Sequence, residues 1–199
     1  MTQLATPASV TGNFDGQTIT LYGRSYHLER RGNEFWAEFD VPSPNHFEDL
    51  PAPRIRRRIE MITGSHNMQV YWYSTGHQRR LGMLPIVFLH EAQRWVPRLS
   101  AFLEPPDGHS DETGHWNRGC IVCHTTHGDP RAVGLFDFDS RVAEFGIACE
   151  SCRPALRQRG TMTPLPIRPA EPGSEPIDAE IVGLLVVLDD AGAAVDAQR

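Results

Sequence analysis

The sequence contains no lysine, and all 19 of its basic residues are arginine. Acidic residues number 25, so the formal net charge is −6, whereas nucleic-acid-binding surfaces carry a basic excess. The longest apolar run near the carboxyl end, residues 181–188, is far shorter than the roughly 20 residues that span a bilayer. The opening residues, MTQLATPASVTGNF, combine neither a charged start nor an apolar run, so no signal peptide is predicted. We therefore expect no nucleic-acid partner and no membrane span.

Cysteine is also scarce, and its few positions are patterned. The four cysteines form two Cys-x-x-Cys pairs, Cys120 with Cys123 and Cys149 with Cys152. A secreted disulfide scaffold carries more cysteines in a shorter chain, so that class is disfavoured. The pairs therefore indicate a cofactor or metal site.

The first pair is followed at once by His124, which completes the pattern Cys-x-x-Cys-His. This pattern is typical of covalent c-type haem attachment. Cys120 and Cys123 would form thioethers with the two haem vinyl groups, and His124 would bind the iron as an axial ligand. The residue types thus predict covalent haem c.

Zinc is the alternative cofactor. Taken together, the four cysteines read Cys-x2-Cys-x25-Cys-x2-Cys. Four thiolates in two such knuckles form a closed tetrahedral zinc site, although the intervening loop is longer than usual. On spacing alone, a zinc-stabilised structural or interaction domain stays open.

The remaining sequence predicts a mainly β fold with few short helices. Residues 1–12 form a lead-in, 13–100 are β-rich, 101–153 are a loop-rich segment with the cysteines, and 154–199 are a tail. Runs rich in Thr, Tyr, Phe and Trp are separated by turn signals at residues 31–33, 64–65 and 91–92. A short helix is expected at 140–145 and another at 178–188. The proline- and arginine-rich composition after Arg153 predicts a disordered tail.

Several ordered segments resemble the multihaem c-type cytochrome family, specifically the tetratricopeptide-associated, hydroxylamine-oxidoreductase-like cytochromes. The matching residues are Trp116-Asn117, Cys120 to His124, and EFGIACESCRP at 144–154, together with GNFDGQTITLYG, ITGSHNMQVYWY and LPIVFLHEAQRWVPR. The resemblance covers roughly residues 11–153. It implies one β-rich domain over 13–153, electron transfer between closely spaced haems, and a periplasmic or extracytoplasmic location. It also implies other haem domains or redox proteins as partners.

The chain departs from that family at three points. The earlier Cys-x-x-Cys-His motifs are missing, and at the second pair Arg153 stands where a histidine is expected. Arginine is always protonated and cannot bind iron, so a haem on Cys149 and Cys152 would need another ligand. The abrupt change after Arg153 suggests a frameshifted end, so we expect a fragment of a longer cytochrome or a non-functional remnant of one.

His66 and His127 are the candidates for the second axial ligand of the iron. His66 falls in a break between two expected strands, where functional side chains commonly converge. His127 is three residues beyond His124 and would need a sharp loop, or would serve a neighbouring haem. For each, an ordinary solvated loop histidine is the alternative. No catalytic residue is predicted, and an electron carrier is favoured over an enzyme.

Overall fold

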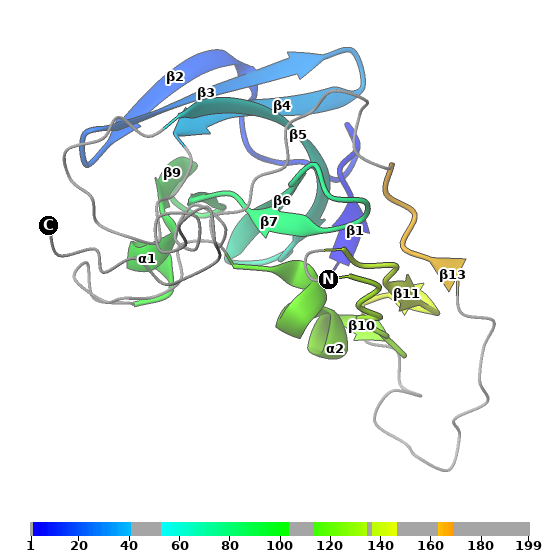
Figure 1. The fold of residues 1–199 in the computed structure, drawn as a ribbon. Helices are drawn as coiled ribbons and strands as arrows, with labels where there is room; N and C mark the ends of the chain where they lie inside the picture. The colour runs from blue at the N-terminus through cyan, green and yellow to red at the C-terminus, as the bar shows by residue number, and fades with distance from the viewer. Residues whose placement is uncertain (1, 41–52, 104–113, 135–136, 147–162, 169–199) are drawn as a thin grey trace, which may run out of the picture.

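The computed structural model describes residues 2–40, 53–103, 114–134, 137–146 and 163–168. Its central feature is one antiparallel nine-stranded sheet (Figure 1). The strands are β1 (Thr2–Leu4), β2 (Asp15–Leu21), β3 (Arg24–Arg31), β4 (Glu34–Asp40), β5 (Arg54–Thr63), β6 (Met68–Ser74), β7 (Leu81–Met83), β8 (Ile86–Leu89) and β9 (Arg94–Pro97). Strands β2 and β9 stand at opposite ends of the pairing order and contact one another, so the sheet is nearly closed.

The expected turns are confirmed, and glycine conformations explain two of them. Gly32, between β3 and β4, has φ +60°, and Gly64, between β5 and β6, has φ +94°. A Cβ atom at position 64 would overlap the carbonyl oxygen of Met68, so only glycine fits this turn. The turn expected near residues 91–92 joins β8 to β9.

The central strands are buried on both faces. Alternation along β6 directs Tyr71 and Tyr73 into one core, and Val70 and Trp72 into a second core on the opposite face. The first core is rich in aromatic rings, with Phe14 edge-on to Phe35 at 5.2 Å between ring centroids. The second core lies between the sheet and the cysteine-bearing segment. This double burial explains why the sequence of β6 is almost continuously apolar.

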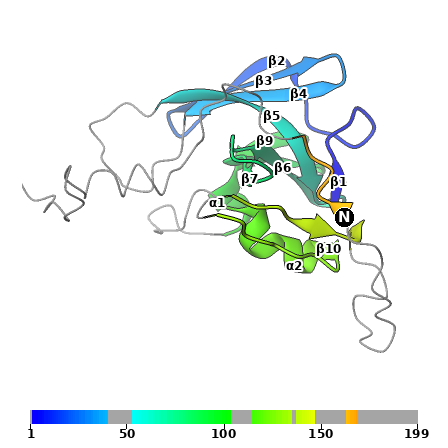
Figure 2. The ribbon, with the colours of Figure 1, turned by 45° about the vertical axis from the view of Figure 1, so that its right-hand side comes forward.

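The remaining elements are short and lie mostly below the sheet in Figure 2. They comprise α1 (Arg98–Ala101), the π-helical turn η1 (Trp116–Cys120), α2 (Ile121–His124), β10 (Thr125–Thr126), β11 (Arg141–Val142), β12 (Glu144–Phe145) and β13 (Thr163–Pro164). The mainly β class with few short helices is confirmed. Among the described residues, no helix has the length and apolarity needed to cross a membrane.

The helix expected at 140–145 is wrong, because this segment forms β11 and β12 instead. Ser140 and Val142 are both buried, with exposed fractions of 0% and 3%, which is the two-residue period of a strand. The Ser140 hydroxyl donates to the carbonyl of Pro130 at 2.7 Å.

Two segments given minor roles by the sequence belong to this domain. Within the lead-in, β1 pairs with β5 and Thr2 is 1% exposed. Within the expected tail, β13 pairs with β11, and Leu165 and Ile167 are buried in the second core. The prediction of a disordered tail is therefore wrong for residues 163–168, which pair with β11 and bury Leu165 and Ile167 despite their prolines. The helix expected at 178–188 lies outside the described residues.

Candidate functional site

The first cysteine pair lies on a short helical segment formed by η1 and α2. Residues three and four apart share a helix face, so Cys120, Cys123 and His124 line one side of a single turn. Cys120 is half-buried, whereas Cys123 and His124 are exposed. Ile121 points to the opposite side and is fully buried in the second core, which contributes about 1.5–3 kcal/mol. The helix therefore exposes Cys123 and His124, whereas Cys120 and Ile121 pack against the second core.

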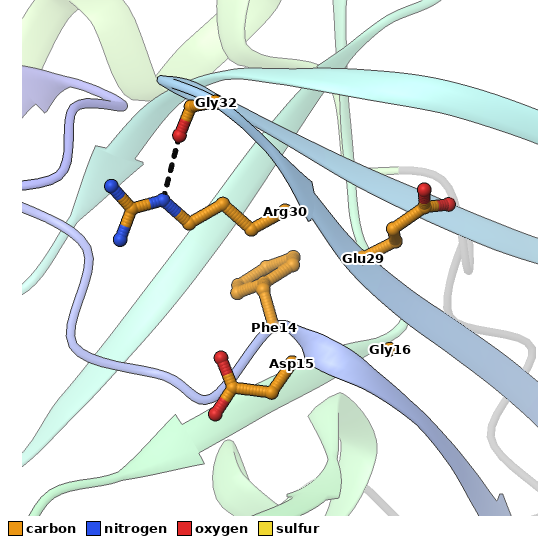
Figure 3. Close-up of a pocket in the computed structure, with 6 residues that line it drawn as sticks. All are labelled: Phe14, Asp15, Gly16, Glu29, Arg30 and Gly32. Atoms are coloured by element: carbon orange, nitrogen blue, oxygen red, sulfur yellow. Dashed lines mark hydrogen bonds between the residues drawn. The ribbon is translucent and has the colours of Figure 1, made fainter.

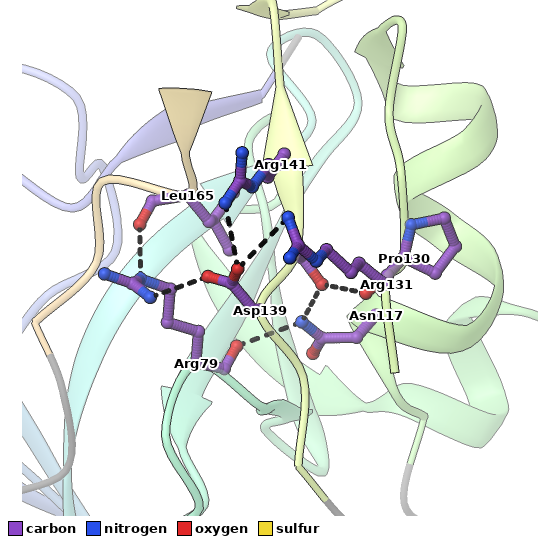
Figure 4. A network of polar contacts seen from close by, with 8 residues as sticks. Arg79, Asn117, Pro130, Arg131, Asp139, Arg141 and Leu165 are labelled. Carbon is purple, nitrogen blue, oxygen red and sulfur yellow. Dashed lines mark hydrogen bonds and ion pairs between the residues drawn. The ribbon is translucent and has the colours of Figure 1, made fainter. Parts of the chain in front are cut away.

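Asn117 ties this helical segment to the rest of the domain (Figure 4). Its Oδ1 accepts a hydrogen bond from the backbone amide of Leu81 at 2.9 Å. Its Nδ2 donates to the carbonyl of Arg79 at 3.0 Å and to the Ser140 hydroxyl at 2.8 Å. Asn117 is fully buried. One side chain thus joins the helix to β7, to the turn before it, and to the segment before β11.

A partly exposed ion-pair network lies beside Asn117. The Asp139 carboxylate forms ion pairs with three arginines (Figure 4). Its oxygens lie 3.1 Å from a guanidinium nitrogen of Arg79, 3.3 Å from one of Arg141 and 3.6 Å from one of Arg131. The Nε of Arg79 also donates to the carbonyl of Leu165. Exposed ion pairs contribute little individually, so this network mainly orders the loops around the helix.

Two tryptophans support the histidine. The ring of Trp116 packs against His124 with 6.0 Å between centroids, and against Trp72 with 5.3 Å. Partial burial lowers the pKa of His124, and burial raises the pKa of Cys120. The lowered pKa of His124 favours the uncharged imidazole, which is the form that binds a metal.

The backbone of His124 is fixed on two sides. Its carbonyl accepts the Thr2 hydroxyl at 2.7 Å and the amide of Gly146 at 3.2 Å. Directly after it, β10 pairs with β12, and the Thr126 hydroxyl donates to the carbonyl of Gly146. The helical turn therefore ends against both the first strand of the chain and β12.

Of the other predicted ligands, His66 and His127 lie within the described ranges, and neither belongs to a metal-binding group there. His66 is exposed in the turn between β5 and β6, where its Nδ1 lies 2.9 Å from the Ser65 hydroxyl. His127 is half-buried after β10, with φ +51°. Within the described ranges, no three His, Cys, Asp or Glu side chains are grouped to hold a metal ion. Cys149 and Cys152 lie outside those ranges, so zinc binding by four cysteines stays a prediction.

A surface hollow of about 490 Å³ lies elsewhere, against β2 and β3 (Figure 3). It is lined by Phe14, Asp15, Gly16, Glu29, Arg30 and Gly32. Arg30 donates to the carbonyl of Gly32 at 2.8 Å, and Glu29 pairs with Arg31 and Arg56. These charges are largely engaged with protein groups, and none of the predicted site residues lines the hollow.

No protein-family model, curated protein or solved structure matches this chain. The site is therefore interpreted from its own residues. Sequence reasoning did not assign a role to Thr2 or Asn117, although Asn117 stands in the Trp-Asn pair before the first cysteine. The partners of both are distant in sequence, so no local pattern indicates their roles.

Proposed function

We propose that this chain is a haem-binding electron-transfer module with one complete attachment site at Cys120, Cys123 and His124. The observation that carries the proposal is the shared face of these three side chains on one helical turn, with both thiols free. Covalent attachment needs two thiols and a histidine on the same side of the chain. Bound haem would supply one-electron chemistry at its iron.

The residues present fit such a group in three respects. Cys123 and His124 are exposed, so a large planar ligand has access to them. Partial burial lowers the pKa of His124, which favours the neutral imidazole that binds iron. Trp116 and Asn117 attach the helical turn to the sheet, and a four-residue helix is not stable without such contacts. His66 and His127 remain the proposed candidates for the second axial position.

The proposal extends to location and partners. Attachment of c-type haem takes place outside the cytoplasm, so a functional chain would have to reach that compartment. Other haem domains or small redox proteins are the proposed partners. Cys149 and Cys152 are proposed as thioether sites of a second haem that lacks the usual histidine, because Arg153 follows them.

The test is to export the chain, with a signal peptide placed before residue 1, in a host that matures c-type cytochromes. A denaturing gel stained for haem and a pyridine haemochrome spectrum report covalent haem. We expect haem in the wild-type chain and its loss at this site in Cys120→Ala and Cys123→Ala. Val122→Ala is the matched control, because Val122 lies between the cysteines and is 59% exposed.

The same preparations test the zinc alternative. If the four cysteines form two knuckles, elemental analysis will find about one zinc per chain and no covalent haem. That zinc would be lost in Cys149→Ser as well as in Cys123→Ser. A chain that holds neither haem nor zinc would contradict both functions and indicate a remnant.

A further inference from the structure

We infer that Thr2 is a positioning residue for His124, so that the first strand of the chain is part of the cofactor site. The inference rests on the proposed function, because His124 matters as an iron ligand. It goes beyond that function by assigning a role to a residue 122 positions away in sequence. Thr2 donates to the backbone carbonyl of His124 and would therefore act through that residue.

The contacts around His124 form a closed cycle. Thr2 is paired with Thr63 in the β1–β5 ladder, and the Thr63 hydroxyl accepts the Trp72 indole N–H at 3.0 Å. Trp72 packs on Trp116, and Trp116 packs on His124. The Thr2 hydroxyl then closes the cycle at the His124 carbonyl, 2.7 Å away. His124 is thus held by its ring at one end and by its backbone at the other.

The contact to the His124 ring and the contact to the His124 backbone both start from the same part of the sheet. Thr63 is the last residue of β5, and Trp72 lies on the neighbouring strand β6. Thr2 and Trp72 are almost fully buried, with 1% and 2% exposure. Because packed strands move little relative to one another, the distance between the two supports of His124 is fixed.

The helix itself cannot provide this placement. It has four residues, and the last carbonyls of a helix have no partner within the helix. The chain turns to extended geometry at Thr125, so the His124 carbonyl depends on Thr2 and Gly146 for hydrogen bonds. A metal ligand must be held to within about 0.5 Å by the groups behind it.

The experiment compares Thr2→Val, which keeps the shape and removes the hydroxyl, with Thr2→Ser, which restores it. In the metal-free chain, NMR at one fixed pH measures nuclear Overhauser contacts between the His124 and Trp116 rings. In the exported, haem-loaded chain, the iron would be low-spin where His124 and a second axial ligand both bind it, so the high-spin fraction in the optical spectrum would rise on loss of His124. A hydrogen bond of ordinary strength corresponds to about a two- to tenfold change in that equilibrium.

We expect Thr2→Val to keep covalent haem, to weaken the ring contacts, and to raise the high-spin fraction about two- to tenfold. Thr2→Ser should match the wild-type chain in both readouts. Unchanged ring contacts and an unchanged spectrum in Thr2→Val would overturn the positioning role. If Thr2→Val does not fold, Thr2→Ala is compared with Thr2→Ser by the same measurements.

The two proposals fail in different ways. A wild-type chain without covalent haem would overturn the proposed function. The ring contacts in the metal-free chain would still decide whether Thr2 positions His124, since that measurement needs no haem.

Discussion

Replacing Asn117 by alanine tests how the helical segment is attached to the sheet. The change removes three hydrogen bonds of a fully buried side chain, one that Asn117 accepts and two that it donates. The amide of Leu81 is buried and would lose the partner that Asn117 provides, and the carbonyl of Arg79 would lose its side-chain donor. A buried polar group left without a partner costs about 1–3 kcal/mol.

Two such groups give an expected loss of about 2–6 kcal/mol, a large part of the roughly 5–15 kcal/mol that stabilises a domain. Urea unfolding of the metal-free chain, followed by tryptophan fluorescence, measures the free energy of unfolding. Asn33→Ala is the control, because Asn33 is exposed in the turn between β3 and β4 and should change stability by less than about 0.5 kcal/mol. Equal stabilities for the two variants would refute the role given to Asn117.

Two further predictions concern the sheet. Gly64→Ala should destabilise the domain by more than about 2 kcal/mol in urea unfolding, because it combines a left-handed φ with overlap on the Met68 carbonyl. Gly23 also has a positive φ of +75° but has open space around it, so Gly23→Ala should lower the free energy of unfolding by only about 1 kcal/mol. Equal losses of stability in Gly23→Ala and Gly64→Ala would contradict the overlap with Met68. Burial raises the pKa of Glu60 above its usual 4.5 despite its pair with Arg58, so the folded state holds this proton more tightly than the unfolded state. The free energy of unfolding should therefore fall as pH rises from about 4.5 through the raised pKa of Glu60. Glu60→Gln should flatten this dependence of stability on pH. An unchanged dependence in that variant would contradict the role given to Glu60.

Turn chemistry and side-chain alternation made much of the sheet predictable. Gly32 and Gly64 mark turns that a local pattern can identify, and the aromatic and β-branched runs on either side are strands. The helix expected at 140–145 was wrong because this segment forms the strands β11 and β12. Its strand pairing with Thr163 and Pro164 depends on a segment about 20 residues away.

The candidate site also has a part that the sequence predicts and a part that depends on distant contacts. The spacing of Cys120, Cys123 and His124 is local, so the sequence alone was sufficient to propose them as an attachment site, whereas their shared helix face comes from the structure. The contribution of Thr2 depends on a hydrogen bond across 122 positions. Contacts of this kind follow from the sheet topology, and no short motif encodes them.

The proposal also relates the two cores to two tasks. The aromatic core holding Tyr71 and Tyr73 stabilises the curved sheet, whereas the core on the other face supports the helical turn through Trp72, Trp116 and Ile121. A substitution in the first core should therefore alter stability more than ligand geometry.

Covalent haem on the exported chain is the most direct measurement of the central claim. The account predicts haem that stays bound through denaturation, disappears from the first site in Cys123→Ala, and persists in Val122→Ala. A wild-type chain without covalent haem under conditions that mature a known c-type cytochrome would contradict it.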